Sequence, residues 1–256
     1  MKGLIYREFY LSRKPILLML VTYILFVGMI SLVIISTYKG NLANNPEVGD
    51  MRAYLNAEMY LYAGLVGIIG AVYGHNDVIE KDYKSRWQLY SYTIPVNEKK
   101  IAASKFITRG ILMISGFVLA VLADVIFSAA AKEPLSFGHF KNILILLFGY
   151  GTVCFFDIPM MLKLKTQMKN AAVGLAIVTP LMAGFVYGSY RFLKFCSARA
   201  KELYPHMESD AAIKEVAMPY ILKWRDALLW IAPVVAAVTI VLLYFMTVKE
   251  LKRRRY

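Results

Sequence analysis

The stretch Gly74–Arg109, GHNDVIEKDYKSRWQLYSYTIPVNEKKIAASKFITR, is a charged and aromatic segment that lies between two long apolar runs. Its large apolar residues recur every three or four positions, so in a helix they share one stripe, made of Ile79, Tyr83, Trp87, Tyr90 and Ile94. Two acids, Glu80 and Asp82, flank this stripe. A helix with one such stripe needs a surface on which to bury it, and this requirement organises the rest of the chain.

A proline corner divides this segment into two helices. Pro95 cannot continue a helix, and Asn97 is a favourable N-cap for a second helix that runs into the next apolar segment. Val96 precedes this cap and is placed to pack on Ile101. Composition leaves two interpretations of the first helix open. It docks a partner protein, or it lies on the membrane surface with its aromatic rings at headgroup depth.

The composition of the chain indicates an integral membrane protein. Hydrophobic residues make up 59% of the sequence, charged residues 18%, and the mean hydropathy is +0.52. The net charge of +13 would suggest nucleic acid as the partner of a soluble protein, but here Lys and Arg cluster at the ends of apolar segments, as anionic cytoplasmic headgroups favour. Cys154 and Cys196 are expected to be free thiols.

Six apolar segments are long enough to cross a bilayer, at about residues 15–36, 57–74, 106–130, 140–162, 171–190 and 227–247. We expect a single domain, 1–256, that begins with an interfacial helix at 1–14 and contains a cytoplasmic segment at 75–105 and an extracellular amphipathic segment at 191–226. With both termini in the cytoplasm, 19 of the 30 Lys and Arg residues lie inside and 11 outside. The positive-inside rule favours this orientation.

The predicted extracellular segment contains two helical stripes. One is formed by Ile213, Val216, Tyr220 and Trp224, with Ser209 or Asp210 as its N-cap and an interruption near Pro219, and an earlier one by Phe192, Phe195 and Tyr204. We expect two amphipathic helices at the outer membrane face. The alternative is a loop that packs on the chain's own helices.

Glycines recur in the second and fifth predicted spans, where they allow another helix to approach closely: Gly64, Gly67, Gly70, Gly184 and Gly188. We expect the dimer interface and the translocation path to involve the first, second and fifth spans. Tight packing without a direct role in function is the alternative.

The sequence contains no phosphate-binding motif G-x-x-x-x-G-K-[ST], and its three histidines, His75, His139 and His206, are not at metal-ligand spacing. Asp124 and Asp157 lie within predicted spans, where an ionisable group is a candidate functional site. Exposure at the interface or a packing hydrogen bond explains each of these acids equally well.

The order of residues around the proline corner resembles the cytoplasmic signature of ABC-2 type exporter permeases, in particular the short six-helix branch. The positions that match are Lys84, Ser85, Trp87, Ile94, Pro95, Val96, Lys99, Lys100, Ile101 and Lys105. Asn97 and Glu98 stand where relatives more often have Ser-Arg, and the Gly-Thr of larger members is absent. The signature covers about an eighth of the chain, and the hydropathy layout extends the resemblance over all of it.

This resemblance implies an all-α transmembrane domain of the type V exporter class, paired with a second identical or homologous permease and with two separate cytoplasmic ATPase subunits. ATP and Mg would be bound by the ATPase, so the chain itself would hold no cofactor or metal and would not be an enzyme. It also implies re-entrant helices between the last two spans and a coupling helix that docks on the ATPase through Ile79, Glu80, Asp82, Tyr83, Trp87 and Tyr90.

Among such permeases the chain is similar to the membrane subunits of phenol-soluble modulin and antimicrobial peptide exporters of Gram-positive bacteria. This similarity implies export of an amphipathic peptide across the bacterial plasma membrane. An ABC-2 exporter of a small molecule, lipid or ion is an alternative, and so is a membrane anchor or sensor that recruits a cytoplasmic partner without transport. An ion-coupled transporter is expected to show paired charges in mid-membrane, which the sequence does not show.

Overall fold

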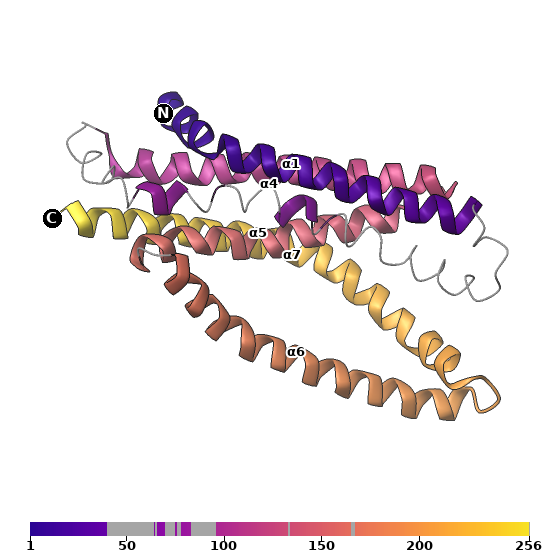
Figure 1. Cartoon of the computed structure of the whole chain (residues 1–256). Coiled ribbons are helices and arrows are strands. Elements are labelled where there is room, and N and C mark those ends of the chain that lie inside the picture. Colours follow the sequence, from indigo (N-terminus) through magenta and orange to yellow (C-terminus); the bar gives the residue numbers. More distant parts are fainter. Residues whose placement is uncertain are drawn as a thin grey trace. The chain divides into compact units, whose positions relative to one another are not determined.

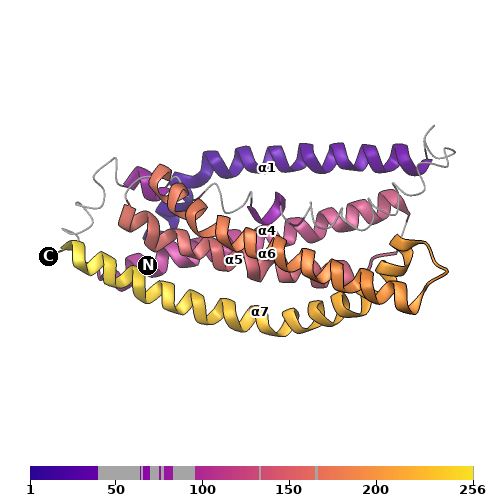
Figure 2. The same cartoon turned by 90° about the horizontal axis from the view of Figure 1, so that it is seen from below.

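The computed structural model describes residues 1–39, 64, 66–69, 75, 78–82, 96–132, 134–164 and 167–255. Its long helices are α1 (Lys2–Lys39), α4 (Glu98–Ala131), α5 (Phe137–Leu164), α6 (Gln167–Leu203) and α7 (Ser209–Arg255) (Figures 1 and 2). Residues 64, 66–69, 75 and 78–82 are also helical, and no strand occurs in the described part of the chain.

Each of the five long helices is long and apolar enough to cross a membrane. They contain the first, third, fourth, fifth and sixth predicted spans. Of the second predicted span, 57–74, only residues 64 and 66–69 are described, so the predicted count of six spans stays a prediction.

Several Ser and Thr hydroxyl groups inside the apolar helices donate a hydrogen bond to the helix that carries them. Thr22, Ser31 and Thr152 each donate a hydrogen bond to the carbonyl four residues earlier, at 2.7 to 2.9 Å. Because a bilayer offers no water to a polar group, both the helical backbone and these internal bonds suit a membrane segment.

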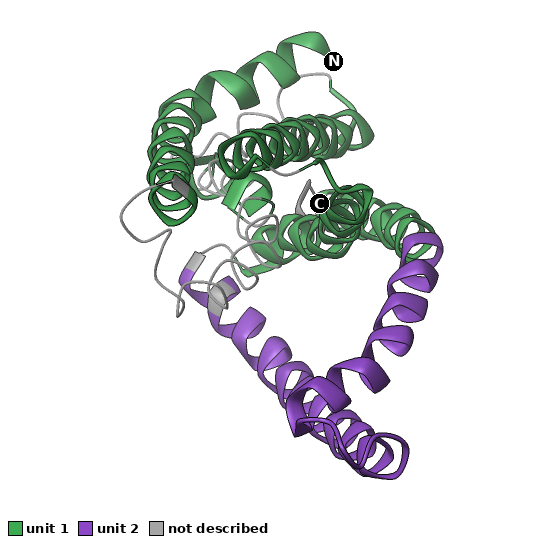
Figure 3. Ribbon diagram, turned by 90° about the vertical axis from the view of Figure 1, so that its right-hand side faces the viewer, with its two compact units in different colours: residues 1–165, 232–256 green, residues 166–231 purple. Residues whose placement is uncertain are grey.

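Residues 1–14, predicted as an interfacial helix, are helical from Lys2 and continue into the first span. α1 is continuous from Lys2 to Lys39, with Pro15 inside it. Its first turns lie at an angle to the rest of the helix (Figures 1 and 3). Pro15 has no N–H to donate and its ring crowds the carbonyl of Leu11, so it bends the helix, whereas the residues before it continue in helical form.

Residues 1–165 and 232–256 form one compact unit, drawn in green in Figure 3. Within it, α4 packs against both α1 and α5. Tyr23 of α1 donates a hydrogen bond to the carbonyl of Leu119 at 2.7 Å, and the apolar contact continues through Ile34 and Phe127. A second core surrounds Ile158 of α5.

The start of α4 agrees with the sequence prediction. Asn97 is the N-cap, and its side-chain oxygen accepts a hydrogen bond from the backbone N–H of Lys99 at 3.0 Å. At the other end, Lys132 adopts a left-handed conformation with φ of 58°, and its N–H donates to the carbonyl of Ala129. Capping hydrogen bonds therefore mark both the first and the last residue of α4.

Residues 166–231 form the second unit, which holds α6 and the first part of α7. The two helices pack through a small core of Cys196, Ala200, Ala212, Val216 and Ala217. The rings of Phe192 and Phe195 meet Tyr220 edge to face, with centroids 6.2 and 6.0 Å apart.

The predicted amphipathic segment 191–226 therefore consists of the two ends of long helices. α6 continues to Leu203, residues 204–208 form the turn, and α7 begins at Ser209 and passes through Pro219 without interruption. The two predicted stripes meet at Phe192, Phe195 and Tyr220, whereas Trp224 is exposed. Both parts of the segment are helical as predicted, and no Pro divides 191–203 from the span before it. Their place at the outer membrane face stays a prediction.

Candidate functional site

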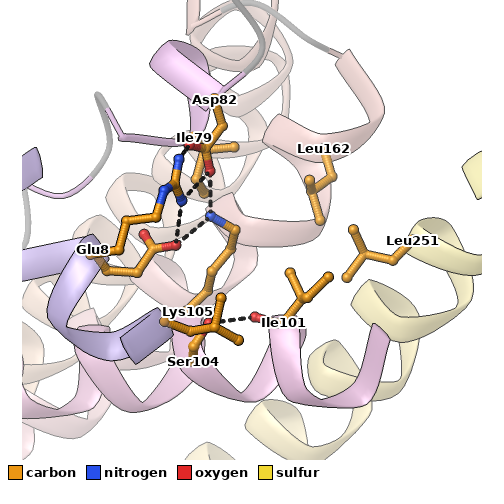
Figure 4. Close-up of a pocket in the computed structure, with 10 residues that line it drawn as sticks. Glu8, Ile79, Asp82, Ile101, Ser104, Lys105, Leu162 and Leu251 are labelled. Carbon is orange, nitrogen blue, oxygen red and sulfur yellow. Dashed lines mark hydrogen bonds and ion pairs between the residues drawn. The ribbon is translucent and has the colours of Figure 1, made fainter. Parts of the chain in front are cut away.

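Four charged side chains and one histidine from distant parts of the chain meet in the first unit. This ion cluster consists of Arg7, Glu8, His75, Asp82 and Lys105. The ammonium Nζ of Lys105 lies 3.0 Å from Glu8 Oε1 and 3.0 Å from Asp82 Oδ2. Figure 4 shows the lysine reaching between the two carboxylates. One cation thus holds two acids that are 74 positions apart in the sequence.

Arg7 and His75 complete the cluster. The guanidinium of Arg7 donates hydrogen bonds to the carboxylate of Asp82, and its Nη1 lies 3.6 Å from Glu8 Oε1. His75 Nε2 lies 3.1 Å from Glu8 Oε2. The arrangement contains two acids and two bases, so its formal charge is balanced when the histidine is neutral.

The cluster is removed from water. The side chains of Glu8, Asp82 and Lys105 are 3%, 8% and 5% exposed. Burial acts to raise the pKa of the Glu8 carboxyl, but Lys105 and His75 hold this pKa well below its usual range. Removal of one partner from a buried ion pair leaves an uncompensated charge and costs about 3–5 kcal/mol. The members of the cluster are therefore stable only together.

Local helical geometry brings these residues to one place. Ile79 and Asp82 are three positions apart, so they share a face of the short 78–82 helix, and both are buried. Lys105 is two turns into α4 after the Asn97 cap. A small pocket beside the cluster has an apolar wall that includes Leu4, Ile101, Leu162 and Leu251 (Figure 4).

Two of the residues predicted to dock an ATPase, Ile79 and Asp82, lie inside the first unit, and their role in docking stays a prediction. Ile79 is 1% exposed in the core of the first unit, and Asp82 is paired with Arg7 and Lys105. The helical period groups these residues correctly on one face, but that face contacts the chain itself. Glu80 is half-buried and Lys81 is exposed on the 78–82 helix.

Several residues of the predicted coupling helix and corner lie outside the described residues: Tyr83, Trp87, Tyr90, Ile94 and Pro95. Of the remaining corner residues, Val96 is half-buried, Lys99 and Lys100 are exposed, and Lys105 is buried in the ion cluster.

Sequence reasoning missed Arg7, Glu8, His75 and Arg109. Arg109 is fully buried one helical turn after Lys105, and its Nη1 donates a hydrogen bond to the carbonyl of Cys154 in α5. The available signal was the i, i+4 spacing of Lys105 and Arg109, which puts two cations on one face of an apolar helix. Two buried cations of this kind require acceptors from elsewhere in the chain.

The two acids within predicted spans are not part of the ion cluster. Asp124 is 7% exposed and its Oδ1 lies 3.1 Å from His139 Nδ1 of α5. Along α4 it is about 28 Å from Lys105, at 1.5 Å per residue, which is close to the thickness of a bilayer core. Asp157 is half-buried in α5.

The glycines differ in their surroundings. A Cβ atom at Gly67 would lie 3.0 Å from the carbonyl oxygen of Gly116 in α4, and one at Gly64 would lie 3.4 Å from Leu146 in α5. Gly184 and Gly188 have no atom within 4 Å of such a Cβ. Gly70 is outside the described residues. Among the predicted glycines that the structure describes, Gly64 and Gly67 are therefore the ones at close helix contacts within the chain.

A family model described as ABC-2 family transporter protein matches residues 51–252. No curated protein and no solved structure matches the chain. The family match covers most of the sequence, including the 78–82 helix and Lys105, and it agrees with the helical fold and its five apolar helices. The chain is a multi-pass membrane protein, and it belongs to the ABC-2 family of transporter proteins.

Proposed function

We propose that the chain is the membrane-spanning permease subunit of an ATP-driven exporter, and that residues 75–105 receive the motion of a separate ATPase. The observation that supports this role is the ion cluster. It ties Asp82, at the beginning of this segment, to Lys105 at its end and to Glu8 of α1. A displacement of the segment therefore acts on two membrane helices directly.

The energy source in this proposal lies outside the chain. The sequence has no G-x-x-x-x-G-K-[ST] motif, in which backbone N–H groups hold the phosphates of a nucleotide. ATP and Mg are therefore assigned to a cytoplasmic ATPase. Its docking surface on this chain includes the exposed side of the 78–82 helix at Lys81, and the stripe that follows in the sequence, Tyr83, Trp87 and Tyr90.

The proposed substrate is an amphipathic peptide that leaves the cytoplasm of a Gram-positive bacterium through its plasma membrane. Met and aromatic side chains adapt to ligands of variable shape, and the chain contains 13 Met and 14% aromatic residues. The proposed complex contains a second copy or a homologue of the chain. The apolar stretch of α6 supports this, because none of it is buried within the chain.

Co-purification tests this function. The tagged chain is extracted in mild detergent from cells that also express the ATPase encoded by a neighbouring reading frame. We expect the ATPase to be retained, and its ATP hydrolysis to rise when a synthetic amphipathic helical peptide is added but not when a scrambled peptide of the same composition is added. A chain that retains no ATPase under these conditions contradicts the proposal and supports an anchor or sensor.

A further inference from the structure

We propose that a pocket between the end of α4 and the start of α5 binds one membrane phospholipid whose headgroup carries an ammonium. The ammonium contacts Asp124, and an acyl chain lies along the exposed apolar side of α4. This inference goes beyond the proposed function, because it requires neither an ATPase nor an exported peptide. It concerns the first unit alone, to which both helices belong.

The pocket has a lining that suits a cation with an apolar body. Its volume is about 360 Å³, within the usual range of sites for small molecules. Of the described residues that line it, only Asp124 and Ser136 are polar. The rings of Phe137 and Phe140 form part of its wall and stack with their centroids 6.0 Å apart. Aromatic faces attract cations, so the rings and the carboxylate favour the same ligand.

Asp124 supplies the negative charge of the pocket. It is 7% exposed, and its Oδ1 lies 3.1 Å from His139 Nδ1. A carboxylate has two oxygens that together accept about four hydrogen bonds, so the contact with His139 uses only part of this capacity. A charge so far from water is costly unless a cation pairs with it. An ammonium in the pocket would provide this pairing.

The place of the pocket along α4 corresponds to the headgroup region of a bilayer. α4 is long and apolar enough to cross the membrane, and Asp124 is about 28 Å by helical rise from Lys105. This distance is close to the thickness of the hydrocarbon core, so the two polar sites lie near its two surfaces. A ligand held by Asp124 therefore has its charged part at the depth of the lipid headgroups.

Two lysines give the rim of the pocket the opposite charge. Lys141 Nζ lies 5.6 Å from the centre of the Phe137 ring, and Lys132 is exposed at the end of α4. Positive charge at the rim favours the phosphate of a lipid, whereas the buried carboxylate favours an ammonium. The two charges together match a zwitterionic headgroup.

The exposed side of α4 offers a surface for an acyl chain. Its large apolar residues recur every three or four positions and are each 41–63% exposed: Ile111, Ile114, Val118, Leu122 and Val125. Val125 also lines the pocket, so this stripe leads from the middle of the helix to Asp124. A helix of another protein would cover the apolar residues but would leave the carboxylate without a cation. Charge complementarity therefore favours a lipid.

Binding of lipids to the purified full chain in detergent tests this inference. The probes are phosphatidylethanolamine and phosphatidylglycerol with the same short acyl chains, so that only the first carries an ammonium. We expect native mass spectrometry to show that the wild type prefers phosphatidylethanolamine. Asp124→Asn should bind this lipid about tenfold more weakly, as for the loss of one charge-assisted hydrogen bond, and should bind phosphatidylglycerol as before.

Two further variants separate charge from packing. Asp124→Glu retains the charge and should keep the preference for phosphatidylethanolamine. Asp157→Asn changes an acid of α5 that does not line the pocket, and as the matched control it should behave as wild type. The two affinities are compared within each variant, so a general loss of stability does not change their ratio.

A fluorophore on α4 locates the acyl chain. Leu122→Cys and Leu181→Cys each place a thiol at an exposed position, the first on the stripe and the second on α6, whereas the native cysteines are buried. We expect phosphatidylethanolamine with brominated acyl chains to quench the label at residue 122 more strongly than brominated phosphatidylglycerol does. The two lipids should quench the label at residue 181 equally.

Equal affinity of the wild type for the two lipids overturns the inference, and so does an unchanged preference in Asp124→Asn. Absence of quenching at residue 122 would show that protein rather than lipid covers the stripe. If Asp124→Asn weakens binding of a synthetic amphipathic peptide and not of the lipid, the pocket belongs to the exported substrate instead. None of these results concerns retention of the ATPase, so failure of the proposed function is a separate result.

Discussion

A lysine at the start of an apolar helix usually extends toward water or lipid headgroups, but Lys105 turns into the chain between two carboxylates. Asp82 accepts from Lys105 and from Arg7, and Ile79 packs one turn away in the core. Buried residues of the 75–105 segment therefore hold it to the membrane helices. In the proposed function, other residues of the segment bind the ATPase.

Substitutions at Ile79 and Trp87 distinguish packing within the chain from binding of the ATPase. Ile79→Ala should lower the free energy of unfolding by about 2–5 kcal/mol, because it removes a buried side chain from the core. Trp87→Ala should leave unfolding unchanged and weaken ATPase docking by about 2 kcal/mol, roughly thirtyfold in affinity, as for a large aromatic anchor. Thermal unfolding in detergent and a titration with the ATPase measure the two effects. Intact docking and stimulation in a Trp87→Ala, Tyr83→Ala double variant would show that the segment is only a membrane-surface helix.

At the scale of helices, the space around each glycine shows whether its helix packs closely against another helix of the chain. The helix that carries Gly67 approaches the backbone of α4 so closely that even a methyl group would be tight. Gly184 in α6 has open space on the same test. The predicted dimer interface is therefore to be sought at α6 rather than at Gly67.

Leucine substitutions at these two glycines distinguish packing from association. Gly67→Leu should lower the melting temperature of the single chain, with a cost of about 1–3 kcal/mol for overpacking. Gly184→Leu should leave this melting temperature unchanged and reduce only the association of two copies. Differential scanning fluorimetry and cross-linking in membranes measure the two effects. Equal melting temperatures for Gly67→Leu and the wild type would contradict the close contact with α4.

Local signals explain which parts of these elements were predictable. The start of α4 at Asn97 follows from a cap and a proline within three positions, and the apolar helices follow from hydropathy. The burial of Ile79 against the chain itself could not be predicted from the sequence. A 3.6-residue period shows which residues share a face, but not what that face contacts. Glu8 is 97 positions from Lys105, and no local pattern reports such a pair.

At the scale of the whole molecule, charge and length fix the expected placement in the membrane. The ion cluster and the Asp124–His139 pair lie near opposite ends of α4, about 28 Å apart by helical rise. Basic residues gather at the ends that carry both termini. This distribution predicts a cytoplasmic ion cluster and an extracellular turn between α6 and α7.

Cysteine labelling in intact cells tests this orientation. Lys99→Cys and Lys201→Cys each replace an exposed lysine, and the native cysteines are buried. A membrane-impermeant maleimide should label Lys201→Cys in intact cells and Lys99→Cys only after the cells are opened. The reverse pattern would place both termini outside.

ATP-dependent peptide uptake by inverted membrane vesicles tests the role of the chain most directly, since export from the cytoplasm becomes uptake in this geometry. The vesicles contain the chain and its ATPase, and the probe is a fluorescent amphipathic helical peptide. We expect uptake that requires ATP, the ATPase and this chain together. Uptake that continues without ATP, or equally in vesicles that lack the chain, would contradict its assignment as the permease of an ATP-driven exporter.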